Sequence, residues 1–117
     1  NLLEEYMYDD DAKVMTHELN DFKLGNVDRL VYYFYGTGNN GKTTLINILD
    51  QLFDDGSGNR VVFKQNVFNS NEYLIPYQSR YILFLENNTL PDQQLMNEFI
   101  NEANVPVRII TFPHTYV

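Results

Sequence analysis

The strongest constraint on this chain is a glycine-rich turn that separates an apolar run from an amphipathic run. The turn reads Gly-Thr-Gly-Asn-Asn-Gly at residues 36–41, and residues 29–35 before it are mostly apolar or aromatic. An unbroken apolar run predicts a strand that is buried on both faces of a parallel sheet. A helix over about 43–53 is predicted by the helical spacing of Leu45, Ile48, Leu49 and Leu52. The three segments together predict a strand–loop–helix corner.

The segment from Gly36 to Thr43 fits the phosphate-binding pattern G-x-x-x-x-G-K-[ST]. Glycines let such a loop curl with its N–H groups inward, and the following helix adds the positive end of its dipole. In this pattern Lys42 neutralises β- and γ-phosphate charge, and the hydroxyl of Thr43 binds Mg²⁺. We therefore expect ATP and Mg²⁺ to be bound by Gly36, Thr37, Gly38, Asn39, Asn40, Gly41, Lys42, Thr43 and Thr44. The alternative is a glycine turn at a strand–helix corner that holds no ligand.

The rest of the chain alternates between strand-like and helix-like segments. Strands are predicted at 60–65 and 81–85, a helix at 89–103 with Thr89 as its cap, and an extended segment at 105–112. Residues 66–77 are ambiguous, since they contain a proline. Alternation of this kind predicts an α/β fold with a mostly parallel sheet flanked by helices. We expect residues 1–24 to form a helical lead-in and residues 25–117 to form the core.

A carboxylate follows the second strong strand, at Glu86. Phosphate-loop proteins use such an acid to hold Mg²⁺ or to orient the attacking water. We therefore expect Lys42 and Glu86 to be catalytic, and Thr43 and Glu86 to hold the metal. The alternative is an ordinary exposed Glu at the end of a strand. Asn87 stands where many ATPases have a second acid, and an amide can position a water but cannot act as a base.

Composition narrows the choice of function. The net charge of −8 makes a free-standing domain a poor non-specific binder of DNA or of an anionic membrane. No apolar run approaches the roughly 20 residues of a membrane-spanning helix. Without Cys, the chain can form neither disulfides nor a Cys-based zinc site. His17 and His114 have no ligand-spaced partner, and Asp9–Asp11 are expected to form a solvated turn between two helices.

Three segments carry a resemblance to a known family. "LGNVDRLVYYFYGTGNNGKTTLINIL" resembles the start of the ATPase domain in superfamily 3 helicases, of the primase–helicase type found in poxviruses, other large DNA viruses and some phages. "QSRYILFLEN" is similar to the strand that ends in Glu in this family. "LMNEFINEANVPVRIITF" is similar to its helix, loop and Arg-containing hairpin. The resemblance covers residues 24–112.

The resemblance implies a P-loop NTPase fold of the AAA+-like kind and the ATP-hydrolysing motor of a viral replicative DNA helicase. It implies a hexameric ring that binds single-stranded DNA through its centre, at a replication site in the host cytoplasm or nucleus, with no membrane partner. Arg108 matches the hairpin residue that contacts DNA, although pairing with Glu98 or Glu102 is an equal alternative. A second alignment makes residues 107–112 a sheet strand. The sensor Asn and the arginine finger would lie beyond Val117, so we expect an incomplete piece with weak activity.

Two other functions remain open from the sequence. One is a small phosphate-loop phosphotransferase such as a nucleoside or nucleotide kinase. Such an enzyme needs an acceptor site and commonly an arginine-rich lid, whereas this chain has four dispersed arginines. The other is a nucleotide-binding domain without catalysis.

Overall fold

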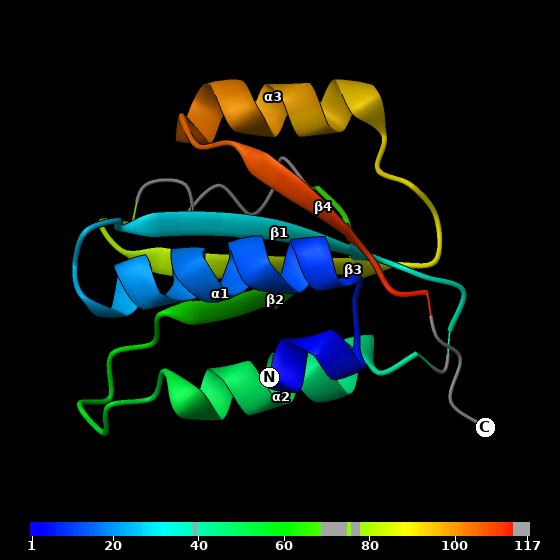
Figure 1. The fold of residues 1–117 in the computed structure, drawn as a ribbon. Helices are drawn as coiled ribbons and strands as arrows, with labels where there is room; N and C mark the ends of the chain where they lie inside the picture. The colour runs from blue at the N-terminus through cyan, green and yellow to red at the C-terminus, as the bar shows by residue number, and fades with distance from the viewer. Residues whose placement is uncertain (39, 69–74, 76–77, 114–117) are drawn as a thin grey trace.

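The computed structural model describes residues 1–38, 40–68, 75 and 78–113. Its centre is a four-stranded sheet with the order β2-β3-β1-β4 (Figure 1). All three pairs of neighbouring strands are parallel. The strands are β1 (Arg29–Tyr35), β2 (Val62–Gln65), β3 (Tyr81–Asn87) and β4 (Val107–Thr111). The prediction of an α/β fold with a parallel sheet flanked by helices is confirmed.

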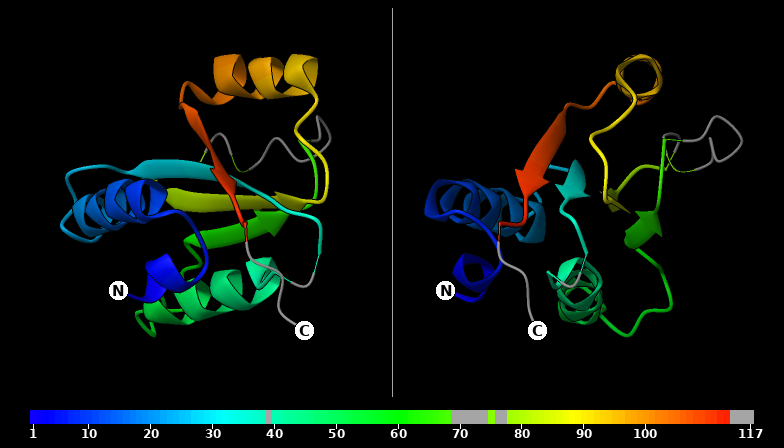
Figure 2. Two further views of the ribbon diagram at one scale, coloured as in Figure 1. Left: turned by 45° about the vertical axis from the view of Figure 1, so that its right-hand side comes forward. Right: turned by 90° about the vertical axis from the view of Figure 1, so that its right-hand side faces the viewer.

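Helices cover both faces of this sheet. The chain begins with the short 3₁₀ helix η1 (Leu2–Glu5) and continues through α1 (Asp9–Lys23), α2 (Lys42–Leu52) and α3 (Gln93–Ala103). Figure 2 shows α1 and α2 on one side of the sheet and α3 on the other. No helix in the described part of the chain is both long and apolar enough to pass through a bilayer.

Two apolar clusters hold these layers together, one on each face of the sheet. On the α1 and α2 face, Tyr32 and Phe84 stack with their ring centroids 5.7 Å apart. On the α3 face, Phe68 packs against Phe99. Strand positions alternate between the two clusters because successive side chains of a strand point to opposite faces. The face with α1 and α2 also buries side chains of the lead-in, namely Leu3, Met7, Ala12, Met15, Leu19 and Phe22.

Several predicted boundaries shift by a few residues. Helix α2 begins one residue earlier than expected, at Lys42, and its predicted core residue Leu52 is 65% exposed while Ile46 is buried. Thr89 is not the cap of α3. That role belongs to Asp92, whose side chain accepts a hydrogen bond of 3.0 Å from the backbone N–H of Leu95. An Asp directly before the first turn satisfies a donor that Thr89 is too far back to reach.

Asp9–Asp11 form the first turn of α1, so the expectation of a turn between two helices is wrong. Three carboxylates are favourable there because the N-terminal end of a helix carries positive dipole charge. The ambiguous segment at 66–77 lies largely outside the described residues.

Residues 107–111 form a strand of the sheet instead of the arm of a hairpin. They are β4, which pairs in parallel with β1 and has Arg108 opposite Tyr32. Parallel strands require a crossover connection, and α3 supplies it between β3 and β4. Burial of Ile110 and Phe112 in the core draws this segment into the sheet. The hairpin expected from the resemblance is therefore wrong, and the alignment that made 107–112 a sheet strand describes the segment better.

Candidate functional site

The loop after β1 turns sharply and leads directly into α2. Gly38 and Gly41 have φ values of 98° and 83°, a left-handed conformation that side chains disfavour. Gly41 is the N-cap of α2 and has no side chain with which to cap it. The first backbone bond of the helix runs from the N–H of Leu45 to the carbonyl of Gly41, at 2.9 Å. The N–H groups of residues 42–44 therefore remain available to an anion at this helix end.

Asn40 is itself a residue of the loop, and its side chain restricts which residue can stand at position 36. A Cβ at Gly36 would stand 1.9 Å from Nδ2 of Asn40, so a side chain there requires Asn40 to move. Asn40 is only 3% exposed, and Nδ2 has no hydrogen-bond partner among the described residues. A buried donor without a partner is costly, so the position of Asn40 is maintained by the packing around it. The absence of a side chain at Gly36 is what leaves room for Asn40 in the loop.

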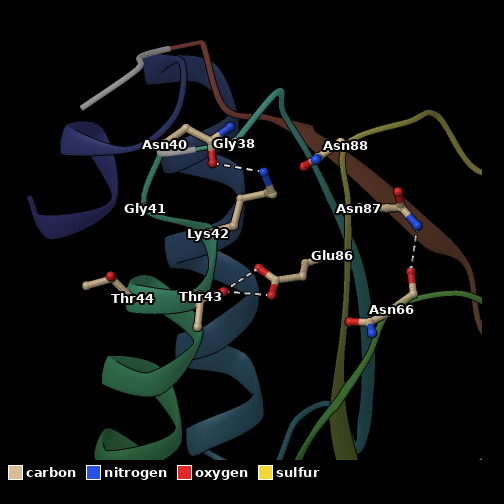
Figure 3. A pocket seen from close by; sticks show the side chains of 10 residues that line it. All are labelled: Gly38, Asn40, Gly41, Lys42, Thr43, Thr44, Asn66, Glu86, Asn87 and Asn88. Atoms are coloured by element: carbon tan, nitrogen blue, oxygen red, sulfur yellow. Dashed lines mark hydrogen bonds between the residues drawn. The ribbon is translucent and has the colours of Figure 1, made fainter. Parts of the chain in front are cut away.

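Lys42 carries the positive charge of this loop. Its Nζ donates to the carbonyl of Gly36 at 2.8 Å. It also donates to Oδ1 of Asn40 at 2.9 Å, as Figure 3 shows. The side chain is 6% exposed. Burial lowers the pKa of Lys42, and the nearby carboxylate of Glu86 raises it again. The ammonium group therefore sits inside the loop.

Glu86 reaches the loop because β3 lies directly beside β1. It stands opposite Phe34 in the register, at the carboxyl ends of both strands. The hydroxyl of Thr43 lies 2.7 and 2.9 Å from its two carboxylate oxygens. Thr43 and Glu86 are thus brought together as the sequence predicted. Two oxygen-bearing side chains suit Mg²⁺, which keeps several waters and takes its remaining ligands from substrate phosphates.

Lys64 in β2 is a site residue that sequence reasoning missed. Its Nζ lies 3.0 Å from Oε1 of Glu86. A lysine inside a short predicted strand has no local signal for such a contact. The sequence predicted strands at 60–65 and 81–85, but it did not predict that the two lie side by side.

A cavity of about 540 Å³ opens in front of these groups. On one side lies the loop, and on the other lie Asn66, Asn87 and Asn88 (Figure 3). Asn87 was expected beside Glu86 at this site from the sequence, but Asn66 and Asn88 were not assigned to it. Asn87 is held in place, since its Nδ2 donates to the carbonyl of Asn66 at 3.1 Å. The lining combines loop, helix and strand-end residues: Gly38, Asn40, Gly41, Lys42, Thr43, Thr44, Asn66, Glu86, Asn87 and Asn88. Predicted loop residue Thr37 is exposed, and Asn39 lies outside the described residues.

Arg108 is engaged away from this cavity. Its Nε and Nη2 donate to the two carboxylate oxygens of Glu18 in α1, at 2.9 and 3.1 Å. The expected partners Glu98 and Glu102 are therefore not the ones that hold it. Glu18 also accepts a hydrogen bond from the hydroxyl of Tyr32 at 3.1 Å. A contact between Arg108 and DNA stays a prediction.

His17 is not among the residues that line the described cavity. His17 lies 3.3 Å from Asp21 within α1, and His114 is not among the described residues. Over the described ranges, no group of three or more His, Asp or Glu side chains is arranged to hold a metal on its own. A metal at this site would need the oxygens of a bound phosphate in addition to Thr43 and Glu86.

Comparisons of the chain with protein-family models, curated proteins and solved structures gave no match. The fold and the site together define an α/β protein with a glycine-rich loop, a helix N-terminus and a cavity at the carboxyl edge of a parallel sheet. Ligands of such sheets bind in the crevice beyond the carboxyl ends of the strands.

Proposed function

We propose that this domain is a P-loop NTPase that binds ATP with Mg²⁺ and hydrolyses the bond between its β- and γ-phosphates. The observation that carries the proposal is the contact of Thr43 with Glu86 beside the buried ammonium group of Lys42. These three groups are the cation, the hydroxyl and the carboxylate that phosphoryl transfer requires at one point. Their convergence is independent of the sequence pattern, since Glu86 comes from a different strand.

Each side chain has a distinct role in this proposal. The N–H groups at the start of α2 and the ammonium group of Lys42 hold the β- and γ-phosphates. Thr43 and Glu86 hold Mg²⁺, which neutralises phosphate oxygens when it is bound. Glu86 also orients the attacking water, and Asn87 lies next to it with an amide that can position the same water.

We further propose that the hydrolysis drives a viral-type replicative DNA helicase, as the resemblance to superfamily 3 implies. The net charge of −8 gives the chain little electrostatic hold on a phosphate backbone. The hold on single-stranded DNA is therefore expected from the assembled ring and from parts of the assembly other than this domain.

One observation supports a second candidate, a phosphotransferase of the nucleotide kinase kind. The side of the cavity away from the loop is lined by the amides of Asn66, Asn87 and Asn88. Amides both donate and accept hydrogen bonds, so they suit an acceptor that bears hydroxyl groups or a base. Such an acceptor would face the γ-phosphate across the cavity.

ATP turnover by the 117-residue chain, with and without single-stranded DNA and with and without nucleosides, tests both candidates. Hydrolysis stimulated by DNA supports the helicase motor, and phosphate transfer to a nucleoside supports the second candidate. We expect turnover of this chain to stay below about 1 s⁻¹, because no arginine lines the described cavity and an arginine finger is worth roughly 10³- to 10⁵-fold. Failure to bind any nucleotide would contradict both.

A further inference from the structure

The carboxylate of Glu86 already has a cationic partner. Nζ of Lys64 lies 3.0 Å from Oε1, the same oxygen that is 2.7 Å from the Thr43 hydroxyl. Glu86 is therefore paired with the ammonium group of Lys64 and hydrogen-bonded to the hydroxyl of Thr43, while Lys42 makes its hydrogen bonds to Gly36 and Asn40. The site contains two ammonium groups with different partners.

The register of the sheet explains why Lys64 reaches Glu86. Lys64 stands opposite Phe84 in the pairing of β2 with β3. Residues 84 and 86 point to the same face of the sheet, because side chains alternate along a strand. Lys64 shares that face, and its four-carbon stem spans the remaining distance along the strand direction. The contact follows from backbone pairing and needs no special loop conformation.

The two lysines differ in their freedom to move. Lys42 is buried and makes two hydrogen bonds inside the loop. The side chain of Lys64 is 36% exposed, and the ion pair with Glu86 is the contact that holds it at the site. A partly exposed lysine can turn its ammonium group into water at little cost, because an ion pair that solvent can reach is weak.

We propose that Lys64 is a positioning residue that competes with Mg²⁺ for Glu86. In the metal-free protein its ammonium group holds the carboxylate beside Thr43. Glu86 and Thr43 would hold the metal with their oxygens, and the ammonium group of Lys64 would then turn toward solvent. This proposal rests on the proposed function, because it assigns Mg²⁺ to these two side chains.

The test is a titration with Mn²⁺, a paramagnetic substitute for Mg²⁺, followed by electron paramagnetic resonance in the presence of a non-hydrolysable ATP analogue. Lys64→Met is expected to bind Mn²⁺ about two- to fivefold more tightly than the unmodified protein, because the competing cation is gone. Lys64→Gln is a second variant in case the first folds poorly, and Lys64→Arg keeps the charge and is expected to leave the affinity unchanged. Lys13→Met, on the exposed side of α1, removes the same charge away from the pair.

A parallel titration with ATP in the presence of EDTA separates two roles of Lys64. We expect Lys64→Met and Lys64→Gln to leave the affinity for metal-free ATP unchanged, because in this proposal Lys42 and not Lys64 binds the phosphates. Unchanged Mn²⁺ affinity in folded Lys64→Met or Lys64→Gln would overturn the proposal, and so would equal tightening in Lys13→Met. A loss of metal-free ATP affinity in the Lys64 variants would also overturn it, by making Lys64 a phosphate ligand. If the unmodified protein binds no ATP, the proposed function itself fails, and this inference fails with it.

Discussion

The hydroxyl of Thr43 lies 2.7 Å from Oε1 of Glu86, although 43 positions separate the two residues in the chain. The contact exists because β1 and β3 are direct neighbours and end at the same edge of the sheet. Thr43 follows the loop after β1, and Glu86 lies in the last part of β3. Parallel pairing therefore assembles the candidate site from two segments that lie far apart in the sequence.

Replacement of Lys42 by Ala should abolish most nucleotide binding. The variant loses the buried cation of the loop, and hydrogen bonds to charged groups are worth about 1.5–3 kcal/mol. Affinity for ATP should fall roughly tenfold to hundredfold, measured by isothermal titration calorimetry. Lys13→Ala is the matched control, because it removes an exposed lysine from α1. Unchanged affinity in Lys42→Ala would show that the loop does not hold phosphate.

Glu86→Gln should separate binding from hydrolysis. Glutamine keeps the size and hydrogen bonding of the side chain but cannot bind metal as a carboxylate or orient water as a base. Hydrolysis should fall about 10²-fold or more, while ATP affinity changes much less. Single-turnover hydrolysis and equilibrium binding on the same preparation measure the two effects. Glu98→Gln, on the exposed side of α3, controls for the loss of one negative charge. Equal losses of binding and hydrolysis would mean that Glu86 mainly maintains the structure of the site.

Gly36→Ala should destabilise the protein through Asn40. The new Cβ would stand 1.9 Å from Nδ2 of Asn40 and 3.1 Å from the carbonyl oxygen of Phe112. Overpacking of this kind costs about 1–3 kcal/mol of unfolding free energy, measured by chemical denaturation. Adding Asn40→Ala should restore much of that loss, because it removes the nearer clash. Additive effects of the two substitutions would contradict this account of the loop.

Stability should fall at alkaline pH, partly through Tyr32. Burial raises the pKa of Tyr32 above its ordinary value of 10.0, and the nearby carboxylate of Glu18 raises it further. The folded protein therefore keeps a proton that the unfolded chain releases. This contribution is complete below pH 10 and is lost as the pH rises above it, at up to about 1.4 kcal/mol per pH unit.

Tyr32→Phe should make the alkaline fall shallower in urea denaturation followed by circular dichroism between pH 8 and 11. Lys42 acts in the opposite direction, because burial lowers its pKa and deprotonation then favours the folded state. That effect is common to the variant and the unmodified protein, so the difference between them reports Tyr32. Tyr8→Phe, at a side chain that is 57% exposed, is the control. Parallel curves for Tyr32→Phe and the unmodified protein would rule out this role.

Features that depend on neighbouring residues were predictable from the sequence. The bounds of β1 at 29–35 were predicted correctly, and α2 differed by one residue at each end. An unbroken apolar run, a glycine turn and a helical repeat each express a backbone preference that acts within a few residues. The position of the glycine-rich turn between β1 and α2 followed from the same local pattern.

Features that join distant segments were decided only by the tertiary structure. Arg108 was predicted either to contact DNA or to pair with Glu98 or Glu102, and the structure pairs it with Glu18, which is 90 positions away. The partner of Lys64 depends on the register of β2 with β3, and the placement of β4 depends on which apolar side chains bury together. Strand order and register are set by packing between elements. The packing contacts join residues that are far apart in the sequence, so local residue spacing does not predict them. The sequence by itself therefore determined the parts of the site, while the sheet decided which of those parts meet.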